Sequence, residues 1–392
     1  MCRSFSSFRC ITMSTIKRYA SNHAPLDSSK LIIEKTTTPK IKLPNDKLIF
    51  GKTFTDHMLE IEWTEDNGWG APKISPYHAL KLDPSTVVFH YAFELFEGLK
   101  AYKDPQGNIR TFRPNKNMER MNESAERIAL PNFESEELLK LIDKLLIVDK
   151  DFVPEGKGYS LYLRPTMIGT TAGLGVGTPD KALLYVIASP VGPYYSSGFR
   201  PVSLEATDYA VRAWPGGVGD KKLGANYAPC IVPQLQAAKR GFQQNLWLFG
   251  KEGYITEVGT MNVFFVFKDK ESGKKELVTA PLDGTILEGV TRDSILQLAR
   301  DRLNQDEWII SERKFTIYEV EEKAKNGELI EAFGAGTAAV VSPINNIGFK
   351  GENINVPVSL ESSGELTAQI GEWIRKIQYG EEEYKDWSRI AK

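Results

Sequence analysis

Cysteine and long apolar stretches are both scarce in this sequence, and each scarcity excludes a class of protein. Three cysteines occur in 392 residues, and two of them, Cys2 and Cys10, fall in a leader that we expect to be cleaved. The one remaining thiol, Cys230, excludes a disulfide framework and a zinc site built on cysteines. No apolar run approaches the ~20 residues that span a bilayer, so we expect no membrane association.

Positive charge is not in excess either. Lys and Arg number 49 against 51 for Asp and Glu, which gives a formal net charge of −2 and no attraction for nucleic acid. The four histidines lack the HExxH spacing of a zinc site: His23, His57, His78 and His90. They are more typical of structural positions than of metal ligands, and we expect no metal.

The amino-terminal segment differs in composition from the rest of the chain. Residues 1–24 contain no Asp or Glu but are basic and rich in serine. This composition is typical of a mitochondrial presequence, and a disordered tail is the alternative. The first interpretation predicts a mitochondrial (matrix) location, whereas translation from Met13 would give a cytosolic form.

The length of the chain indicates two domains, because single cores stop growing at ~250–300 residues. Composition shifts predict an extended arm at 25–48, a small α/β domain at 49–188, a connector at 189–200 and a larger domain at 201–392. In the small domain, patterning predicts strands at 54–63, 86–93, 159–164 and 182–188, a hairpin of 99–102 with 109–112, and helices at 115–128 and 135–148. In the larger one it predicts strands at 246–249, 262–267 and 276–279, and helices at 229–241, 290–303 and 317–326. The expected fold class is α+β.

The segment GGVGDKKLGANY, residues 216–227, places two lysines among four glycines. Inside a helix or strand, glycine lowers stability by roughly 0.5–1 kcal/mol relative to alanine, so four glycines here predict an irregular backbone. A lysine held there is a candidate amine nucleophile if its surroundings lower its pKa. A surface turn with two solvated lysines is an equally good interpretation of this segment alone.

Three further segments complete a possible site. Glu257 precedes an apolar strand and could pair with a protonated ring nitrogen, although a solvated rim charge is the commoner case. Residues 284–292 lead into a helix whose first amides favour a phosphate, and residues 333–339 form a small-residue loop suited to an anion. Each is weak evidence alone; with the lysine they match the needs of pyridoxal phosphate.

At this point the sequence resembles a known family. The segments YAFELFEGLKAY, FRPNKNMERM, YLRPTMIGT, GGVGDKKLGANYAP, TEVGTMNVFF, GTILEGVTRDS and FGAGTAAVVSP are similar to those of the branched-chain aminotransferases and occur in the same order. They cover roughly residues 48–390, and with its leader the chain is similar to the mitochondrial fungal members. The resemblance implies the two-domain fold of fold-type IV pyridoxal-phosphate enzymes, as in D-amino-acid aminotransferase.

The resemblance also implies roles for cofactor-binding residues. Lys222 resembles the Schiff-base lysine, and its Lys-Leu-Gly-x-Asn-Tyr context selects it over Lys221. The resemblance implies that Glu257 would contact the ring nitrogen of the cofactor and that Tyr227 would contact its phenolic oxygen. The phosphate would be held by Arg113, the amides of Val290 and Thr291, and Thr337. Some members carry Cys-x-x-Cys where this chain has 339–342 (AVVS), so we expect no thiol control there.

The substrate site implied by the resemblance is lined mostly by aromatic residues. The α-carboxylate would rest on the amides of Thr260 and Ala338, near the Tyr91 hydroxyl. The pocket wall would include Phe50, Tyr91, Phe96, Tyr162, Arg164 and Tyr194, with Leu174 and Val176 from the second subunit of a homodimer. Arg164 would also accept the side-chain carboxylate of glutamate.

The expected activity is a ping-pong transamination of L-leucine, L-isoleucine and L-valine with 2-oxoglutarate, giving branched 2-oxo acids and L-glutamate. Such a reaction serves branched-chain amino acid synthesis and degradation. Lys222 would move the α-proton. Four alternatives remain: a D-amino-acid aminotransferase, an aminodeoxychorismate lyase, a catalytically silent regulatory protein, and a phosphate-ligand-binding domain without the cofactor.

Overall fold

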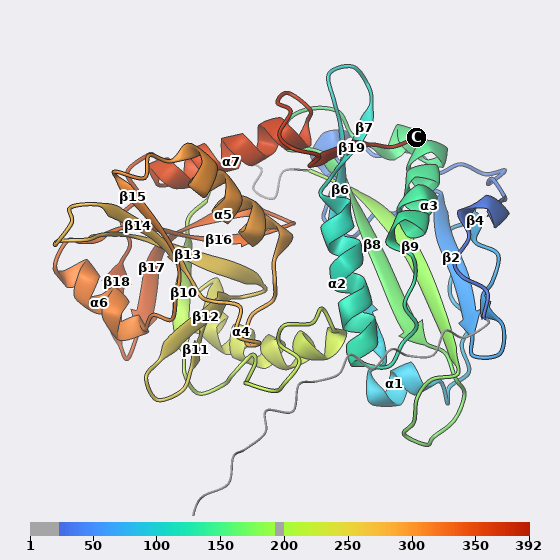
Figure 1. Ribbon diagram of the computed structural model, residues 1–392, viewed down its shortest axis with the longest axis horizontal. Helices are drawn as coiled ribbons and strands as arrows, with labels where there is room; N and C mark the ends of the chain where they lie inside the picture. Colours follow the sequence, from blue (N-terminus) through green and yellow to red (C-terminus); the bar gives the residue numbers. More distant parts are fainter. Residues whose placement is uncertain (1–22, 193–199) are drawn as a thin grey trace, which may run out of the picture.

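The computed structural model describes residues 23–192 and 200–392. Most of the predicted leader and the predicted pocket residue Tyr194 lie outside the described residues. Figure 1 shows two lobes side by side, each built around one twisted sheet with helices packed against it. This arrangement agrees with the expected α+β class.

The sheet of the first lobe takes nearly all its strands from the first half of the chain. Its order is β1-β4-β2-β9-β8-β6-β7-β19, with β3 beside β2 and β5 beside β8. The strands are β1 (Ile32–Ile33), β2 (His57–Thr64), β3 (Gly68–Trp69), β4 (Lys73–Pro76), β5 (Glu94–Phe96), β6 (Leu99–Lys103), β7 (Ile109–Phe112), β8 (Ser160–Gly169), β9 (Lys181–Val191) and β19 (Ser388–Ile390). The hairpin of β6 and β7 confirms the one expected from the turn at 104–107.

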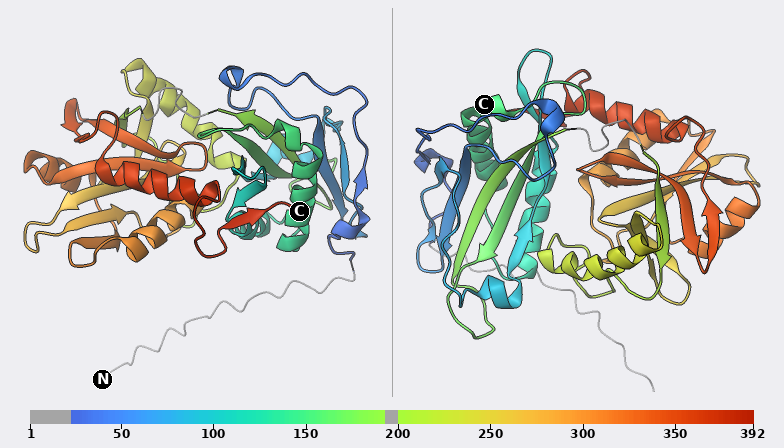
Figure 2. Two further views of the ribbon diagram at one scale, coloured as in Figure 1. Left: turned by 90° about the horizontal axis from the view of Figure 1, so that it is seen from above. Right: turned by 180° about the vertical axis from the view of Figure 1, so that it is seen from behind.

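Two helices cover this sheet, α2 (Pro114–Arg127) and α3 (Ser135–Val148). Met118, Met121 and Ala125 recur at helical spacing on α2 and are completely buried. The helices expected at 115–128 and 135–148 are therefore confirmed. Figure 2 shows the same layering from above and from behind, with β19, near the carboxyl terminus, lying against the first lobe.

The sheet of the second lobe has the order β12-β11-β10-β17-β16-β13-β14-β15, with β18 beside β17. Its strands are β10 (Val202–Thr207), β11 (Gln244–Phe249), β12 (Tyr254–Val258), β13 (Met261–Lys268), β14 (Lys275–Thr279), β15 (Trp308–Glu312), β16 (Leu329–Gly336), β17 (Val340–Phe349) and β18 (Glu352–Asn355). Its helices are α4 (Ile231–Lys239), α5 (Val290–Arg302), α6 (Ile317–Lys325) and α7 (Glu365–Gln378). No helix in the described ranges is long and apolar enough to cross a membrane.

The strand expected at 86–93 is wrong, because α1 (Val87–Tyr91) is a short helix there. Its β-branched and aromatic residues suggested a strand, but the preceding segment starts a helical turn. The Asp83 side chain accepts the Ser85 amide at 2.8 Å, and the Asp83 carbonyl accepts the Thr86 amide at 2.9 Å. Ala92 then adopts φ 53°, which ends the helix.

Two loop boundaries also differ from expectation. Strand β16 continues to Gly336, so only residues 337–339 of the expected small-residue loop form a turn. Glu257 lies inside β12, opposite Asn262 of β13, instead of just before a strand. Pairing with β13 extends β12, and pairing with β13 and β17 extends β16, beyond what the local sequence indicates.

Candidate active site

The glycine-rich segment around Lys222 packs between two elements of the first lobe. The Lys222 amide donates to Ser124 Oγ on α2 at 2.9 Å, and the Phe96 amide on β5 donates to the Lys222 carbonyl at 3.1 Å. A Cβ at Gly224 would lie 1.8 Å from Glu94 Oε2, so a side chain there would displace the Glu94 carboxylate. The backbone that carries Lys222 is therefore held from two sides.

The two adjacent lysines have different surroundings. Lys221 Nζ lies 3.1 Å from Asp220 and 3.3 Å from Glu123. Burial opposes its charge, but these two carboxylates outweigh it and raise the pKa of Lys221. Lys222 Nζ instead donates to Tyr227 Oη at 2.9 Å, and no described carboxylate forms an ion pair with it. The amine without a counter-ion is the one selected from the sequence context.

Glu257 is almost fully buried and holds three hydrogen-bond donors. Its Oε2 lies 2.9 Å from Arg212 Nε, while Oε1 accepts the Leu287 amide at 2.7 Å and Asn262 Nδ2 at 3.2 Å. Burial raises the pKa of Glu257, and the charges of Arg212 and Lys222 with the Leu287 amide act against that rise. A carboxylate offers about four lone-pair sites, so Glu257 has capacity for one more donor.

Sequence reasoning missed Arg212. It lies 45 positions before its partner, and no local pattern relates the two. Arg212 Nη1 also donates to the Gly219 carbonyl at 3.2 Å, which ties the glycine-rich segment to Glu257. The only sequence feature near Arg212 is the glycine-rich segment that follows it, and that segment indicates a role for the lysine.

The first turn of α5 presents backbone amides to the same region. The helix begins at Val290 after Gly289, and its first N–H groups have no partner within the helix. A Cβ at Gly289 would lie 2.0 Å from Asn262 Oδ1, so a larger residue would displace Asn262 or the start of α5. Together with the helix dipole, these amides favour an anion.

A single cavity joins these groups. It contains about 360 Å³ of space free of atoms, part of which is open to solvent. Six residues expected at the site line it: Lys222, Glu257, Thr260, Val290, Thr291 and Thr337. The amine and the carboxylate thus face one space, which also holds the start of α5.

Arg113 is not among the residues that line this cavity. Its Nη1 donates to Ser294 Oγ at 2.7 Å, its Nη2 lies 2.6 Å from Asp293 Oδ2, and its guanidinium stacks 4.1 Å from the Trp387 ring centroid. Asp293 and Ser294 belong to the first turns of α5, so Arg113 contacts the helix whose amides line the cavity. Its role as a phosphate ligand stays a prediction.

Arg120 lines the cavity instead and was not expected there. Its Nε and Nη2 donate to the two oxygens of Glu97 at 2.7 and 2.8 Å, and its Nη1 donates to the Glu288 carbonyl at 2.9 Å. Both side chains are buried. Because Glu288 directly precedes Gly289, this pair fixes the start of α5 to the first lobe.

Several residues of the expected pocket wall contact one another in series. The Phe50 and Tyr162 ring centroids are 4.9 Å apart, and Arg164 Nη2 donates to Tyr162 Oη at 3.2 Å. The Arg164 guanidinium lies 4.6 Å from the Phe96 ring centroid, and Lys222 Nζ lies 4.8 Å from the same centroid. These contacts connect the four residues to the candidate nucleophile, but none of the four lines the cavity at Lys222, so their role as a pocket wall stays a prediction.

Tyr91, Leu174 and Val176 form a separate, exposed group. The Tyr91 hydroxyl donates to the Leu174 carbonyl, and the two aliphatic side chains are 72% and 75% exposed. None of the three lines the cavity at Lys222. Their predicted entry into the pocket of a second subunit stays a prediction.

The turn after β16 contacts a buried lysine. Lys100 Nζ donates to the Ala338 carbonyl at 2.6 Å, and burial lowers the pKa of Lys100 to about 8. Among the described residues no carboxylate forms an ion pair with Lys100. Sequence reasoning missed this residue, since an alternating strand position does not show that a lysine is buried.

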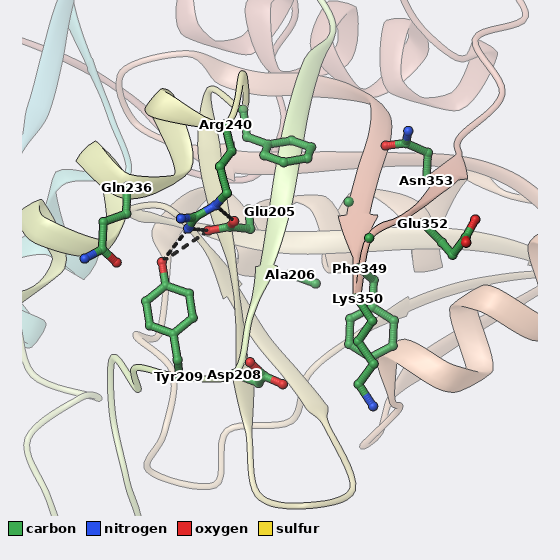
Figure 3. Close-up of a pocket in the computed structure, with 13 residues that line it drawn as sticks. Glu205, Ala206, Asp208, Tyr209, Gln236, Arg240, Phe349, Lys350, Glu352 and Asn353 are labelled. Atoms are coloured by element: carbon green, nitrogen blue, oxygen red, sulfur yellow. Dashed lines mark hydrogen bonds and ion pairs between the residues drawn. The ribbon is translucent and has the colours of Figure 1, made fainter.

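A larger pocket occurs elsewhere on the second lobe, beside β10 and the β17–β18 turn. Figure 3 shows Arg240 bonded to Glu205 and Tyr209 on one side, with Glu352 and Asn353 on the other. None of the residues expected at the site lines this pocket. The candidate chemistry therefore lies in the smaller cavity between the lobes.

Comparison with known proteins agrees with this geometry. Residues 94–347 match the family model "Amino-transferase class IV". The cytosolic branched-chain-amino-acid aminotransferase of Saccharomyces cerevisiae is 68% identical over 369 residues, which is 94% of this chain and 98% of the yeast protein. The mitochondrial enzyme of the same yeast is also 68% identical, over 95% of each chain.

A solved structure shows the same fold. The branched-chain aminotransferase of the thermophilic archaeon Thermoproteus uzoniensis, solved with norvaline, superposes with a TM-score of 0.67 at 25% identity. The match covers 85% of this chain and 99% of that one. The expected fold of fold-type IV enzymes is thus confirmed, and the chain belongs to the class IV aminotransferases, in their branched-chain group.

Proposed function

We propose that this protein transfers the amino group of L-leucine, L-isoleucine or L-valine to 2-oxoglutarate, with pyridoxal phosphate as its cofactor. The observation that carries the proposal is the shared cavity of Lys222 and Glu257 beside the first turn of α5. The substrate class is supported by the names of the yeast relatives, which match nearly the whole chain.

The donor set fits this cofactor. Pyridoxal phosphate supplies an aldehyde that reacts with amines and a ring that withdraws electrons from the substrate α-carbon. Glu257 has one free acceptor site and would hold the protonated ring nitrogen, while Tyr227 would donate to the phenolic oxygen. The amides of Val290 and Thr291 and the Thr337 hydroxyl would hold the phosphate, with Gly289 allowing the close approach.

Lys222 provides the reactive amine. Its Nζ is the group that we expect to take the proton from the substrate α-carbon, because it lines the cavity and has no carboxylate partner among the described residues. General-base transfer of this kind contributes roughly 10²–10⁴-fold to a rate. The Tyr227 hydroxyl, 2.9 Å away, orients the amine.

The pocket wall suits both substrates of a ping-pong exchange. Phe50, Phe96 and Tyr162 offer an apolar surface to branched side chains, and Arg164 offers a cation to the second carboxylate of glutamate. The amides of Thr260 and Ala338 would bind the α-carboxylate that all the substrates share. One pocket then serves both halves of the reaction.

The assembly that we propose is a homodimer. Exposed apolar side chains occur on α4 at Ile231, Val232 and Leu235, and earlier in the chain at Val211 and Trp214. Leu174 and Val176 are also exposed, as residues that enter a partner's pocket would be. Exposed apolar surface, where it is contiguous, marks an association site on a protein.

A mitochondrial (matrix) location is part of the proposal. It is supported by the basic, acid-free composition of residues 1–24 and by the mitochondrial yeast relative. A cytosolic form would arise from Met13. Fractionation of cells that carry the chain with a carboxyl-terminal tag would distinguish the two by compartment and by size.

The activity is tested with purified protein, pyridoxal phosphate, leucine and 2-oxoglutarate. We expect glutamate and the branched 2-oxo acid in equal amounts, and a Lys222→Ala variant without turnover or the absorbance of covalently attached cofactor. Lys221→Ala is the matched control, because that lysine is paired with acids, and it should retain most of the activity.

Three outcomes would overturn the assignment. Turnover of D-amino acids in place of L-amino acids would favour the D-amino-acid enzyme of the same fold. Release of an aryl amine from aminodeoxychorismate would favour the lyase. Retained activity in Lys222→Ala would remove the lysine from its role.

A further inference from the structure

Glu94 is a titratable side chain beside the Lys222 segment that the proposed reaction does not use. On β5, Glu94 lies opposite Ile168 and Phe96 opposite Thr166 of β8. Side chains alternate between the faces of a sheet, so Glu94 and Phe96 share one face with Arg164, two positions from Thr166. Glu94 and Arg164 therefore lie near each other on one face of the sheet.

The carboxylate of Glu94 also contacts the segment that carries Lys222. The Gly224 amide donates to it, and a Cβ at Gly224 would fall 1.8 Å from Oε2. Leu95 and Leu223 pair as an isolated antiparallel bridge next to this contact. The Glu94 side chain, carried by β5, is thus hydrogen-bonded to the Lys222 segment.

Arg164 has aromatic rings but no acid as direct partners. Its guanidinium lies 4.6 Å from the Phe96 centroid and 5.4 Å from that of Tyr162, and its Nε is buried without a hydrogen-bond acceptor. No described carboxylate forms an ion pair with it. Burial raises the pKa of Glu94, and the Gly224 amide and then the charge of Arg164 lower it, so the two charges interact.

We propose that Glu94 is a specificity-determining residue whose negative charge offsets that of Arg164. An uncompensated guanidinium would favour substrates with a second carboxylate and would leave a half-buried charge unpaired beside a leucine side chain. With Glu94 present, the pocket tolerates uncharged branched side chains and still accepts 2-oxoglutarate. This inference rests on the proposed function and on Arg164 facing the substrate side chain.

The test is the ratio of kcat/KM for 2-oxoglutarate to that for 4-methyl-2-oxopentanoate, with valine as the amine donor. Glu94→Gln keeps an acceptor for the Gly224 amide but removes the charge. The ratio should rise roughly three- to tenfold in favour of 2-oxoglutarate, which corresponds to about 0.7–1.4 kcal/mol. Glu62→Gln, at an exposed position of β2, is the surface control and should leave the ratio unchanged.

A pH series separates charge from structure. The groups that face Glu94 are Arg164 on β8, Tyr185 on β9 and the Lys222 segment. Burial raises the pKa of Tyr185 above its usual value near 10, so this phenol stays neutral in the assay range. On acidification Glu94 takes up a proton, and the wild-type ratio should move toward that of Glu94→Gln, whose own ratio should stay flat.

Glu94→Asp keeps the charge and shortens the reach to Gly224, so it should lose overall activity while its ratio stays near wild type. A ratio that is unchanged in Glu94→Gln, or equally changed in Glu94→Asp, would overturn the inference while wild-type transamination still supports the proposed function. Absence of leucine transamination in the wild-type enzyme would instead overturn the proposed function and this inference with it.

Discussion

Arg212 and Glu257 form an ion pair of 2.9 Å in which the two side chains are only 3% and 2% exposed. Removing two charges from water is costly, and the pair persists because the Leu287 amide and Asn262 add hydrogen bonds to the carboxylate. Arg212 therefore favours the ionised form of Glu257, against the rise in its pKa that burial causes. A neutral carboxyl group could not hold a proton on a ring nitrogen.

Arg212→Met should accordingly be damaging. Breaking a buried pair from one side typically costs about 3–5 kcal/mol, because it leaves the other charge uncompensated. We expect a lower midpoint in urea unfolding. We also expect the folded protein to lose activity, beyond the loss caused by unfolding. Arg240→Met is the control: Arg240 also pairs with a glutamate, Glu205, but lies at the surface, where such pairs contribute little.

Lys100→Met tests the buried lysine through pH. Burial lowers the pKa of Lys100 to about 8, below the ordinary value of 10.5 in the unfolded chain. Between these values the unfolded state binds more protons, so wild-type stability should rise with pH relative to Lys100→Met. Between pH 7.5 and 9.5 the difference should approach about 2 kcal/mol in urea unfolding. Parallel stability curves for the two proteins would contradict the burial of a charged amine.

Gly289→Ala should weaken cofactor binding more than folding. The new Cβ would lie 2.0 Å from Asn262 Oδ1. The Nδ2 atom of the same side chain donates a hydrogen bond to Glu257. Either the start of α5 or Asn262 must shift, and the amides of Val290 and Thr291 shift with the helix. Titration of the cofactor-free protein with pyridoxal phosphate should show roughly tenfold lower affinity, since a lost anion contact costs about 1–2 kcal/mol.

The control for this change is Gly173→Ala, where nothing lies within 4 Å of the added Cβ. It should bind the cofactor as the wild type does. Equal affinities for Gly289→Ala and the wild type would show that the start of α5 does not hold the phosphate.

Val232→Glu with Leu235→Glu tests the dimer. Both side chains project from α4 and are 61% and 58% exposed, so charge at these positions should not disturb the fold of one chain. We expect the sedimentation coefficient to fall from that of a dimer to that of a monomer, with loss of activity if Leu174 and Val176 complete the partner's pocket. A wild-type protein that sediments as a monomer would contradict the proposed assembly.

Much of the fold follows from local sequence. The helices at 115–128 and 135–148 were predictable because their apolar residues recur at helical spacing over four turns. The β6–β7 hairpin was predictable from its turn. The segment 86–93 was not, because the hydrogen bonds of Asp83 outweigh strand propensity there, and such competition is not visible in composition.

The sequence by itself determined the chemistry of the site: a lysine in a glycine-rich segment, a glutamate near a strand and a helix start suited to an anion. The tertiary structure alone decided which charges meet. In the fold, Arg212 pairs with Glu257, Arg120 with Glu97 and Arg113 with Asp293, and Lys100 donates to a backbone carbonyl. Charge pairing depends on distances of a few ångströms across separate elements, and a linear pattern of residue types does not contain these distances.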